Sequence, residues 1–248
     1  AHVSLVVLAS FASRVAAIGT TVKSITASSL EQGYHTFTIM DDDSLMCWGD
    51  NSDGRLGVLY LPNDVATSPV GPVNLGTGRT AKAVSLGIKH TCAILDDDTL
   101  KCWGYNQRGQ LGYGDTTDRS APDATAVVNL GAGRTAKAVS AGSSHTCAIL
   151  DDDTVKCWGQ GGSSIGYGDW TQRTAPDATA VVDLGSGRTA KAIFTGRDQN
   201  CAILDDDTLK CWGNNDYGQL GYGDTDARGD AAGEMGDALL AINLGSGR

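Results

Sequence analysis

The stretch that decides the fold is Cys92-Ala93-Ile94-Leu95-Asp96-Asp97-Asp98-Thr99-Leu100-Lys101-Cys102-Trp103-Gly104. Nearly identical copies occupy residues 147–159 and 201–213, and a diverged copy occupies residues 37–49. In every copy two apolar runs flank an acidic turn. This pattern predicts a β-hairpin that is repeated four times along the chain.

The cysteine spacing in this stretch favours a three-residue hairpin loop. With Asp96 and Asp97 near the right-handed helical region and Asp98 left-handed, a G1 bulge closes the turn and places Cys92 directly opposite Cys102. A two-residue loop at Asp97-Asp98 would offset the cysteines by one position and put them on opposite faces. We therefore predict that both cysteines lie within cross-strand reach on one face.

Seven cysteines follow from this repetition, at positions 47, 92, 102, 147, 157, 201 and 211. Six form the predicted disulfides Cys92–Cys102, Cys147–Cys157 and Cys201–Cys211, because pairing opposite positions needs little backbone movement. Cys47 faces Phe37 instead of a cysteine and is predicted to be a free thiol. The alternative is that all seven are reduced, small buried apolar residues. Disulfides would place the protein in an oxidising compartment.

The repeat unit is about 55 residues long, since the Cys-Trp-Gly triplets at 47, 102, 157 and 211 are 55, 55 and 54 residues apart. Each unit begins with a short strand, at Val22 to Thr26, Ala81 to Ser85, Ala136 to Ser140 or Ala190 to Thr195. The hairpin follows, then a glycine-rich turn, a long loop and a fourth short strand such as Ala126 to Leu130. Four short strands per unit are typical of a propeller blade, and the absence of a 3.6-residue apolar period predicts almost no helix.

The residues His90-Thr91-Cys92-Ala93-Ile94-Leu95, Lys101-Cys102-Trp103-Gly104 and Gly109-Gln110-Leu111-Gly112 resemble the regulator of chromosome condensation repeat. The resemblance covers residues from about 20 to 244 and implies an all-β propeller of four-stranded blades. Family propellers usually have about seven blades. Four units therefore form either a small closed ring or an open arc of a larger propeller.

Residues 1–20 form an apolar N-terminal segment ahead of the repeat domain, which we assign to residues 21–248. Three interpretations of this segment compete: completion of a blade, packing against the protein's own surface, and a residual targeting or anchor sequence. As a membrane helix the run is short and contains Arg14.

The net charge of −10 and the isoelectric point near 4.7 argue against some classes of partner. A surface this negative repels phosphate backbones and has no basic patch for anionic lipid. The predicted partners are therefore proteins. The founding family member exchanges guanine nucleotide on a small GTPase and docks on nucleosomes, but no basic tail and no distinct wedge-like insertion are found here.

Two residue sets offer a possible metal or catalytic site. His35, His90 and His145 share one repeat position, which Gln199 fills in the fourth unit, so three histidines from different blades could converge on a metal. We favour the alternative that each His bonds within its own blade. The Asp triplets lack the alternating spacing of a calcium loop. No nucleophile or phosphate-loop motif occurs, so we predict no cofactor, no metal and no enzymatic activity.

The irregular loops, at residues 58–72, 113–125, 167–179 and 222–238, are the predicted sites of specificity. Trp170 lies outside the repeat pattern, where the second unit has Thr116, and is a candidate protein contact. Met235, Leu239 and Leu240, close to acidic residues, are further candidates.

We predict a non-enzymatic binding or scaffold module, such as a peripheral subunit of a larger membrane-associated assembly. A membrane complex would be reached through protein contacts or through residues 1–20. The alternatives are a secreted inhibitor-like or guanine-nucleotide-exchange-like propeller, and a metal-binding or enzymatic propeller. The predicted location is extracellular or an organelle lumen, such as that of a plastid or thylakoid, and cytoplasmic if the cysteines are reduced.

Overall fold

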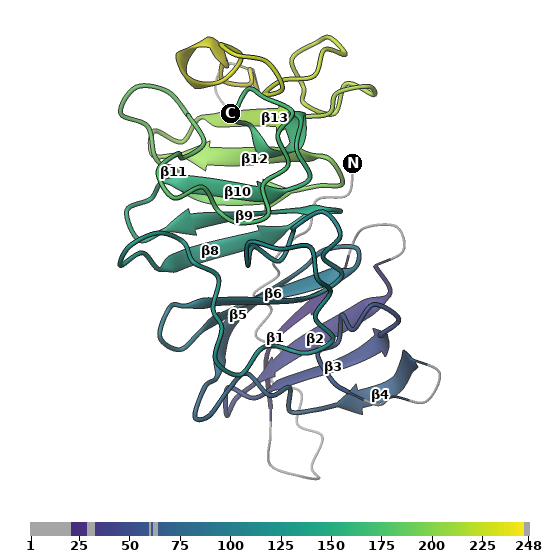
Figure 1. The fold of residues 1–248 in the computed structure, drawn as a ribbon. Helices are drawn as coiled ribbons and strands as arrows, with labels where there is room; N and C mark the ends of the chain where they lie inside the picture. Colours follow the sequence, from purple (N-terminus) through teal and green to yellow (C-terminus); the bar gives the residue numbers. More distant parts are fainter. Residues whose placement is uncertain (1–20, 29–32, 60, 62–63, 246–248) are drawn as a thin grey trace.

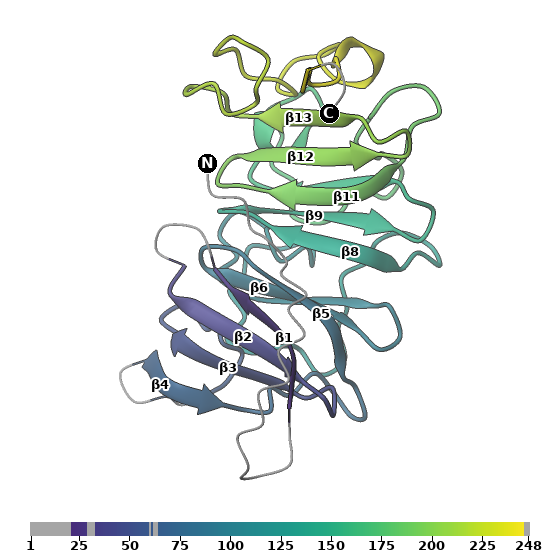
Figure 2. The same ribbon diagram turned by 180° about the vertical axis from the view of Figure 1, so that it is seen from behind.

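The computed structural model describes residues 21–28, 33–59, 61 and 64–245, which form four antiparallel sheets (Figure 1). The N-terminal segment 1–20, with its three interpretations, lies outside the described residues. Both views place the sheet of β1–β4 at one end of the molecule and the sheet of β11–β13 at the other (Figures 1 and 2). The four sheets are the blades of a propeller-type fold, arranged as an arc.

Each blade begins with the strand that the sequence predicts, and the hairpin strands follow in order. The first blade has strand order β1-β2-β3-β4, with bounds Val22–Ala27, His35–Met40, Leu45–Asp50 and Val65–Val70. The second has β5-β6-β7, at Ala81–Leu86, His90–Leu95 and Leu100–Gly104. The third has β8-β9-β10, at Ala136–Ala141, His145–Leu150 and Val155–Gly159. The fourth has β11-β12-β13, at Ala190–Thr195, Gln199–Leu204 and Leu209–Gly213.

The hairpin turns have the predicted geometry. Asp98 has a φ of 63°, and its N–H donates to the Leu95 carbonyl, while the Leu95 N–H donates to the Thr99 carbonyl. The other three units repeat the left-handed Asp, at Asp43, Asp153 and Asp207. This loop sets the register in which Cys92 pairs with Cys102. The three-residue loop inferred from cysteine spacing is therefore confirmed.

Basic residues just before and within the first strand of the second, third and fourth blades pair with the acidic turns. Arg79 forms ion pairs with Asp96 and Asp97, and Lys82 with Asp98. The same pairs recur in the third and fourth blades, from Arg134 and Lys137, and from Arg188 and Lys191. Exposed pairs contribute little individually, but here they tie every hairpin tip to its innermost strand.

The prediction of a fourth strand at Ala126 to Leu130 is wrong. This segment makes one ladder-like bond, from the Val128 N–H to the Leu100 carbonyl, and buries Val128 and Leu130 in the core. The outer position is occupied by β4 in the first blade. In the other blades it is reduced to single bridges that pair Arg119, Arg173 and Arg228 with Gly104, Gly159 and Gly213, respectively.

The hydrophobic cores lie between blades. One joins Phe37, Ile39 and Cys47 of the first blade to Leu95 and Trp103 of the second. The next two cores join the second blade to the third and the third to the fourth in the same way. Trp103, Trp158 and Trp212 are fully buried in these cores. The described part contains the short 3-10 turns η2 (Ser163–Ile165) and η3 (Gly236–Ala238), and no helix there is long and apolar enough to cross a membrane.

Candidate functional site

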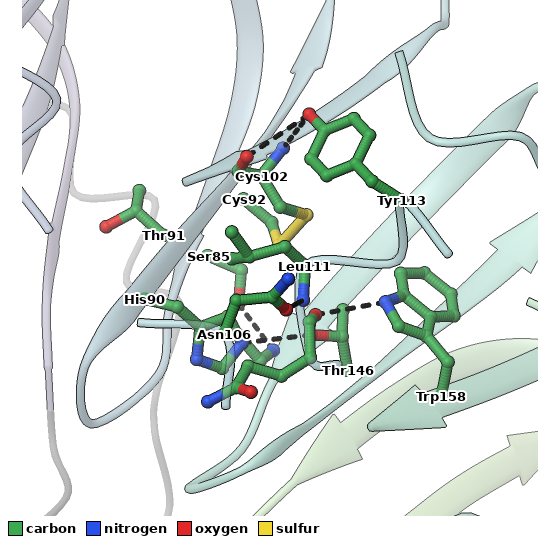
Figure 3. The surroundings of a disulfide bond; sticks show 12 residues. Ser85, His90, Thr91, Cys92, Cys102, Asn106, Leu111, Tyr113, Thr146 and Trp158 are labelled. Carbon is green, nitrogen blue, oxygen red and sulfur yellow. Dashed lines mark hydrogen bonds between the residues drawn. A yellow bond between two sulfur atoms is a disulfide. The ribbon is translucent and has the colours of Figure 1, made fainter. Parts of the chain in front are cut away.

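A hydrogen-bonded node joins each blade to the next through the histidine position. His90 Nε2 lies 2.9 Å from Thr146 Oγ1, which donates to the Gln110 carbonyl at 2.9 Å. Trp158 Nε1 donates to the same carbonyl at 3.0 Å, and Figure 3 shows His90, Thr146 and Trp158 converging. Because Thr146 uses its proton on Gln110, its oxygen must accept from His90, which assigns the proton to Nε2.

The prediction that each His bonds within its own blade is therefore wrong, because the side chains reach across to the next blade. His35 bonds Thr91 and His145 bonds Asn200 in the same manner. Burial lowers the pKa of His35 and of His90 to about 3, so both rings are neutral at physiological pH. Within the described ranges, no group of three or more His, Cys, Asp or Glu side chains is placed to hold a metal ion.

The third interface departs from this pattern. Asn200 replaces the threonine and donates to the Ser164 carbonyl at 2.6 Å. Trp212 Nε1 is buried there without a hydrogen-bond partner. The inter-blade interfaces are therefore structural contacts, and the third is the weaker one because its tryptophan lacks a hydrogen bond. The surface that distinguishes this protein must lie in the loops.

Trp170 is the exposed aromatic that the loop pattern predicts, with 75% of its surface accessible. One face of the indole covers Gly162, where an added Cβ would lie 3.0 Å from the ring. The third unit is one residue shorter than the second between the Cys-Trp-Gly triplet and Tyr167, and the contact falls at this deletion. Trp170 and the shortened turn, which both depart from the repeat, therefore contact each other. The other face of the indole is left to solvent.

In the second and fourth blades an asparagine closes the corresponding loop. Asn106 donates to the carbonyls of Asp115 and Thr117, and Asn215 does the same to Asp224 and Asp226. The third unit has no asparagine in that place, and the Trp170 carbonyl instead lies only 2.4 Å from where a Gly161 Cβ would be. Because Gly161 and Gly162 have no side chains, the Trp170 loop can pack directly against them.

An ion pair holds the base of the Trp170 loop. Arg173 contacts both carboxylate oxygens of Asp169 at 3.0 Å, and its guanidinium lies 4.1 Å from the centre of the Tyr167 ring. The hydrogen bonds from Arg173 lower the pKa of Asp169 to about 2. The Asp169–Arg173 pair therefore holds both ends of the segment that carries the indole.

The structure brings the two predicted contact loops together. The Gly168 N–H donates to the Gly229 carbonyl, and a Cβ at Gly168 would meet the Ala231 carbonyl oxygen at 2.9 Å. The 167–179 and 222–238 loops therefore form one continuous surface across the third and fourth blades. Glu234 closes the second loop by accepting from the N–H groups of Gly229, Asp230 and Ala231.

The remaining contact candidates divide by burial. Leu240 is 71% exposed. Leu239 is 2% exposed, so its side chain is not available to a partner. Met235 is half-buried against the same core. Sequence reasoning missed two exposed tyrosines, Tyr34 and Tyr217, at 69% and 92%. They stand where the second unit has Lys89 and Arg108, and that difference is the signal that could have found them.

The cysteines are arranged as predicted. The three predicted pairs lie at bonding distance, with Cα–Cα separations of 4.1, 4.1 and 4.0 Å. Figure 3 shows the first pair beside Tyr113, whose hydroxyl donates to the Cys102 carbonyl. Cys47 is free and buried opposite Phe37, and burial raises the pKa of its thiol to about 12.

Comparisons with known proteins agree with this architecture. The family model of the regulator of chromosome condensation (RCC1) repeat matches residues 81–110, 136–164 and 190–219, and a second model of the same repeat matches residues 97–149. The ultraviolet-B receptor UVR8 of Arabidopsis thaliana is 32% identical over 178 residues, which cover 71% of this chain and 38% of that protein. The human E3 ubiquitin-protein ligase HERC2 is 28% identical over 197 residues, or 77% of this chain and 4% of that one.

Solved structures share the fold at low sequence identity. Human WBSCR16 has a TM-score of 0.74 at 18% identity and covers 92% of this chain, which in turn covers 54% of it. Yeast Prp20p, studied for its binding to Gsp1p and histones, has a TM-score of 0.71 at 17% identity, with coverage of 91% and 51%. The chain thus spans about half the length of these propellers and well under half of its curated relatives.

Proposed function

This chain carries regulator of chromosome condensation repeats, and on that premise we propose that it is a non-enzymatic protein-binding module whose contact surface is centred on Trp170. The observation that carries the proposal is the pairing of an exposed indole with the only shortened glycine-rich turn among the four units. A large aromatic side chain held by its backbone loses little entropy on binding and suits an interface anchor.

The surroundings of Trp170 support a protein partner. The loop base is held by the Asp169–Arg173 pair, so the indole is presented on a preorganised support. The adjoining 222–238 loop contains five acidic residues, and charged residues beside an apolar anchor are typical of the rim of a protein interface. The nearly identical hairpins cannot distinguish one partner from another, whereas this surface occurs once in the described chain.

We further propose an oxidising location, extracellular or within an organelle lumen, supported by the three cysteine pairs at bonding distance. Within it, the chain serves as a peripheral subunit of a larger, membrane-associated assembly. The support is the apolar sequence of residues 1–20, which suits a chain that packs against a neighbour.

The test is native purification followed by quantitative mass spectrometry of co-eluting proteins, with Trp170→Ala compared with the unchanged chain. The proposal predicts that at least one abundant partner is lost with Trp170→Ala and retained with the matched control Thr116→Ala, at the equivalent loop position in the second blade. Identical sets of co-eluting proteins from all three chains would refute the Trp170 surface.

A further inference from the structure

The third blade is a three-stranded sheet, and a loop closes its outer edge. Cys147 and Cys157 face each other across β9 and β10 with a Cα–Cα separation of 4.1 Å, and at such a close pair the backbone N–H and C=O groups point outward. The Cys157 N–H therefore reaches the Tyr167 hydroxyl, to which it donates at 3.3 Å. Further along the strand, Gly159 pairs with Arg173 through main-chain hydrogen bonds in both directions. The edge strand is thus held by the disulfide on one side and by the loop that begins at Tyr167 on the other.

The loop that closes this edge is also the loop that carries Trp170. The Arg173 guanidinium lies 4.1 Å from the centre of the Tyr167 ring and binds both carboxylate oxygens of Asp169. Trp170 lies between Asp169 and Arg173 in the sequence, so this cluster forms the base of the indole's support. A continuous series of contacts therefore runs from the disulfide through the Cys157 backbone and the Tyr167 hydroxyl to the segment that presents the indole.

The first unit shows what stands in place of this arrangement. It has Phe37 where the other units have the first cysteine, and Val58 where they have the tyrosine. Its outer edge is closed by β4, with which Cys47 pairs. A disulfide, a tyrosine contact and a three-stranded sheet occur together in the other three units, and Figure 3 shows the Tyr113 hydroxyl on the Cys102 backbone of the second. The disulfide and the tyrosine contact together therefore substitute for a fourth strand.

Without its disulfide, β10 would keep fewer constraints than β3. The strand β3 lies between β2 and β4, whereas β10 pairs with β9 alone and meets the loop at the Tyr167 hydroxyl and the Arg173 bridge. A segment opens locally more often when fewer contacts hold it. Breaking the disulfide would therefore raise the population in which β10 and the loop bonded to it are open together.

We propose that the redox state of the Cys147–Cys157 disulfide controls how firmly the Trp170 loop is held, so that reduction loosens this contact surface. The effect on a partner rests on the proposed function, whereas the change in the loop is a property of the chain alone. The step is thiol–disulfide exchange with a dithiol such as dithiothreitol. The protein disulfide takes up two electrons and two protons and becomes two thiols, and the dithiol is oxidised to its own disulfide.

The experiment measures backbone amide hydrogen exchange in the purified full chain. The direct reporter is the Arg173 amide, which donates to the Gly159 carbonyl. In Cys147→Ala/Cys157→Ala this amide should exchange roughly tenfold faster than in the unchanged chain, because local opening is more frequent. The matched control Cys92→Ala/Cys102→Ala removes the equivalent disulfide of the second blade. It should accelerate the Arg119 amide and leave the Arg173 amide unchanged, and dithiothreitol should accelerate both amides in the unchanged chain.

Tyr167→Phe tests the route, because it keeps the ring beneath Arg173 and removes the hydroxyl. It should accelerate the Arg173 amide by itself, and combined with the loss of the third-blade disulfide it should give less than the product of the two separate effects. Unchanged exchange at Arg173 after loss or reduction of the Cys147–Cys157 disulfide would overturn the proposal, as would equal acceleration by the second-blade control. The predicted exchange in a chain that binds no partner would support the redox coupling while refuting the protein-binding function.

Discussion

Replacing Thr146 with valine tests the hydrogen-bonded node between the second and third blades. The substitution removes Oγ1 and leaves the Nε2–H of His90 without an acceptor, at a site where both residues are fully buried. The Gln110 carbonyl keeps its bond from Trp158, so one buried donor loses its partner. An unsatisfied buried donor costs about 1–3 kcal/mol. For a domain of this size, a loss of about 2 kcal/mol corresponds to a melting temperature about 4–8 °C lower.

The assay is thermal and urea unfolding of Thr146→Val beside Thr116→Val, which makes the same change at an exposed loop position. The control should remain within about 0.5 kcal/mol of the unchanged chain. A double-mutant cycle with His90→Leu should be non-additive, because the second change removes the stranded donor. Equal stability of Thr146→Val and Thr116→Val would refute the node as a source of inter-blade stability.

Three further predictions address protonation, redox state and Trp170. The pKa of His35 and of His90 is about 3 in the folded chain and 6.5 in the unfolded chain, so the unfolded chain binds more protons between these values. The free energy of unfolding, measured with urea, should therefore be full above pH 6.5 and lower by about 2 kcal/mol per histidine at pH 5. His90→Gln should reduce the slope of this free energy against pH. Alkylation of the denatured, unreduced chain followed by peptide mapping should label Cys47 alone. Alkylation of the native chain should label no cysteine, because Cys47 is buried. Labelling of all seven cysteines in denatured material would exclude the disulfides and the oxidising location. Trp170→Ala should weaken partner binding by roughly 1–3 kcal/mol while lowering the melting temperature little, since the side chain is 75% exposed; loss of stability with unchanged binding would make it a packing residue.

The repeated hairpins could be predicted in detail because local chemistry determines them. The Asp triplet and the ten-residue cysteine offset together admit one loop length, and the structure has that loop with Asp98 left-handed. The innermost strands were found for the same reason, since each is a short apolar run between turn signals.

The errors concern contacts between units, which repetition alone does not reveal. The alternation of Val128 and Leu130 is that of a strand, yet their role is to fill the core between blades. His90 was assigned a partner in its own blade, although the partner is Thr146, the residue that follows the equivalent histidine in the next copy. Leu239 resembled a surface residue because it follows an acidic loop, but η3 turns it into the core.

The candidate surface was found in part because it breaks the repeat. Trp170 was visible as the single aromatic among loop threonines, and its exposure agrees with that prediction. Its contact with Gly162 could not be predicted, because it depends on how the shortened turn places the glycine pair beneath the indole. The contact between Gly168 and the 222–238 loop likewise depends on the packing of the third blade against the fourth.

Site-specific photocrosslinking tests the central claim of a protein-contact surface at Trp170 most directly. A photoreactive phenylalanine analogue is placed at position 170, and in a second chain at position 116, the equivalent loop site of the second blade. After irradiation in the native setting, crosslinked proteins are identified by mass spectrometry. The account predicts a discrete crosslinked protein from position 170 that is absent from position 116. No crosslinked protein at position 170, or the same products from both positions, would contradict it.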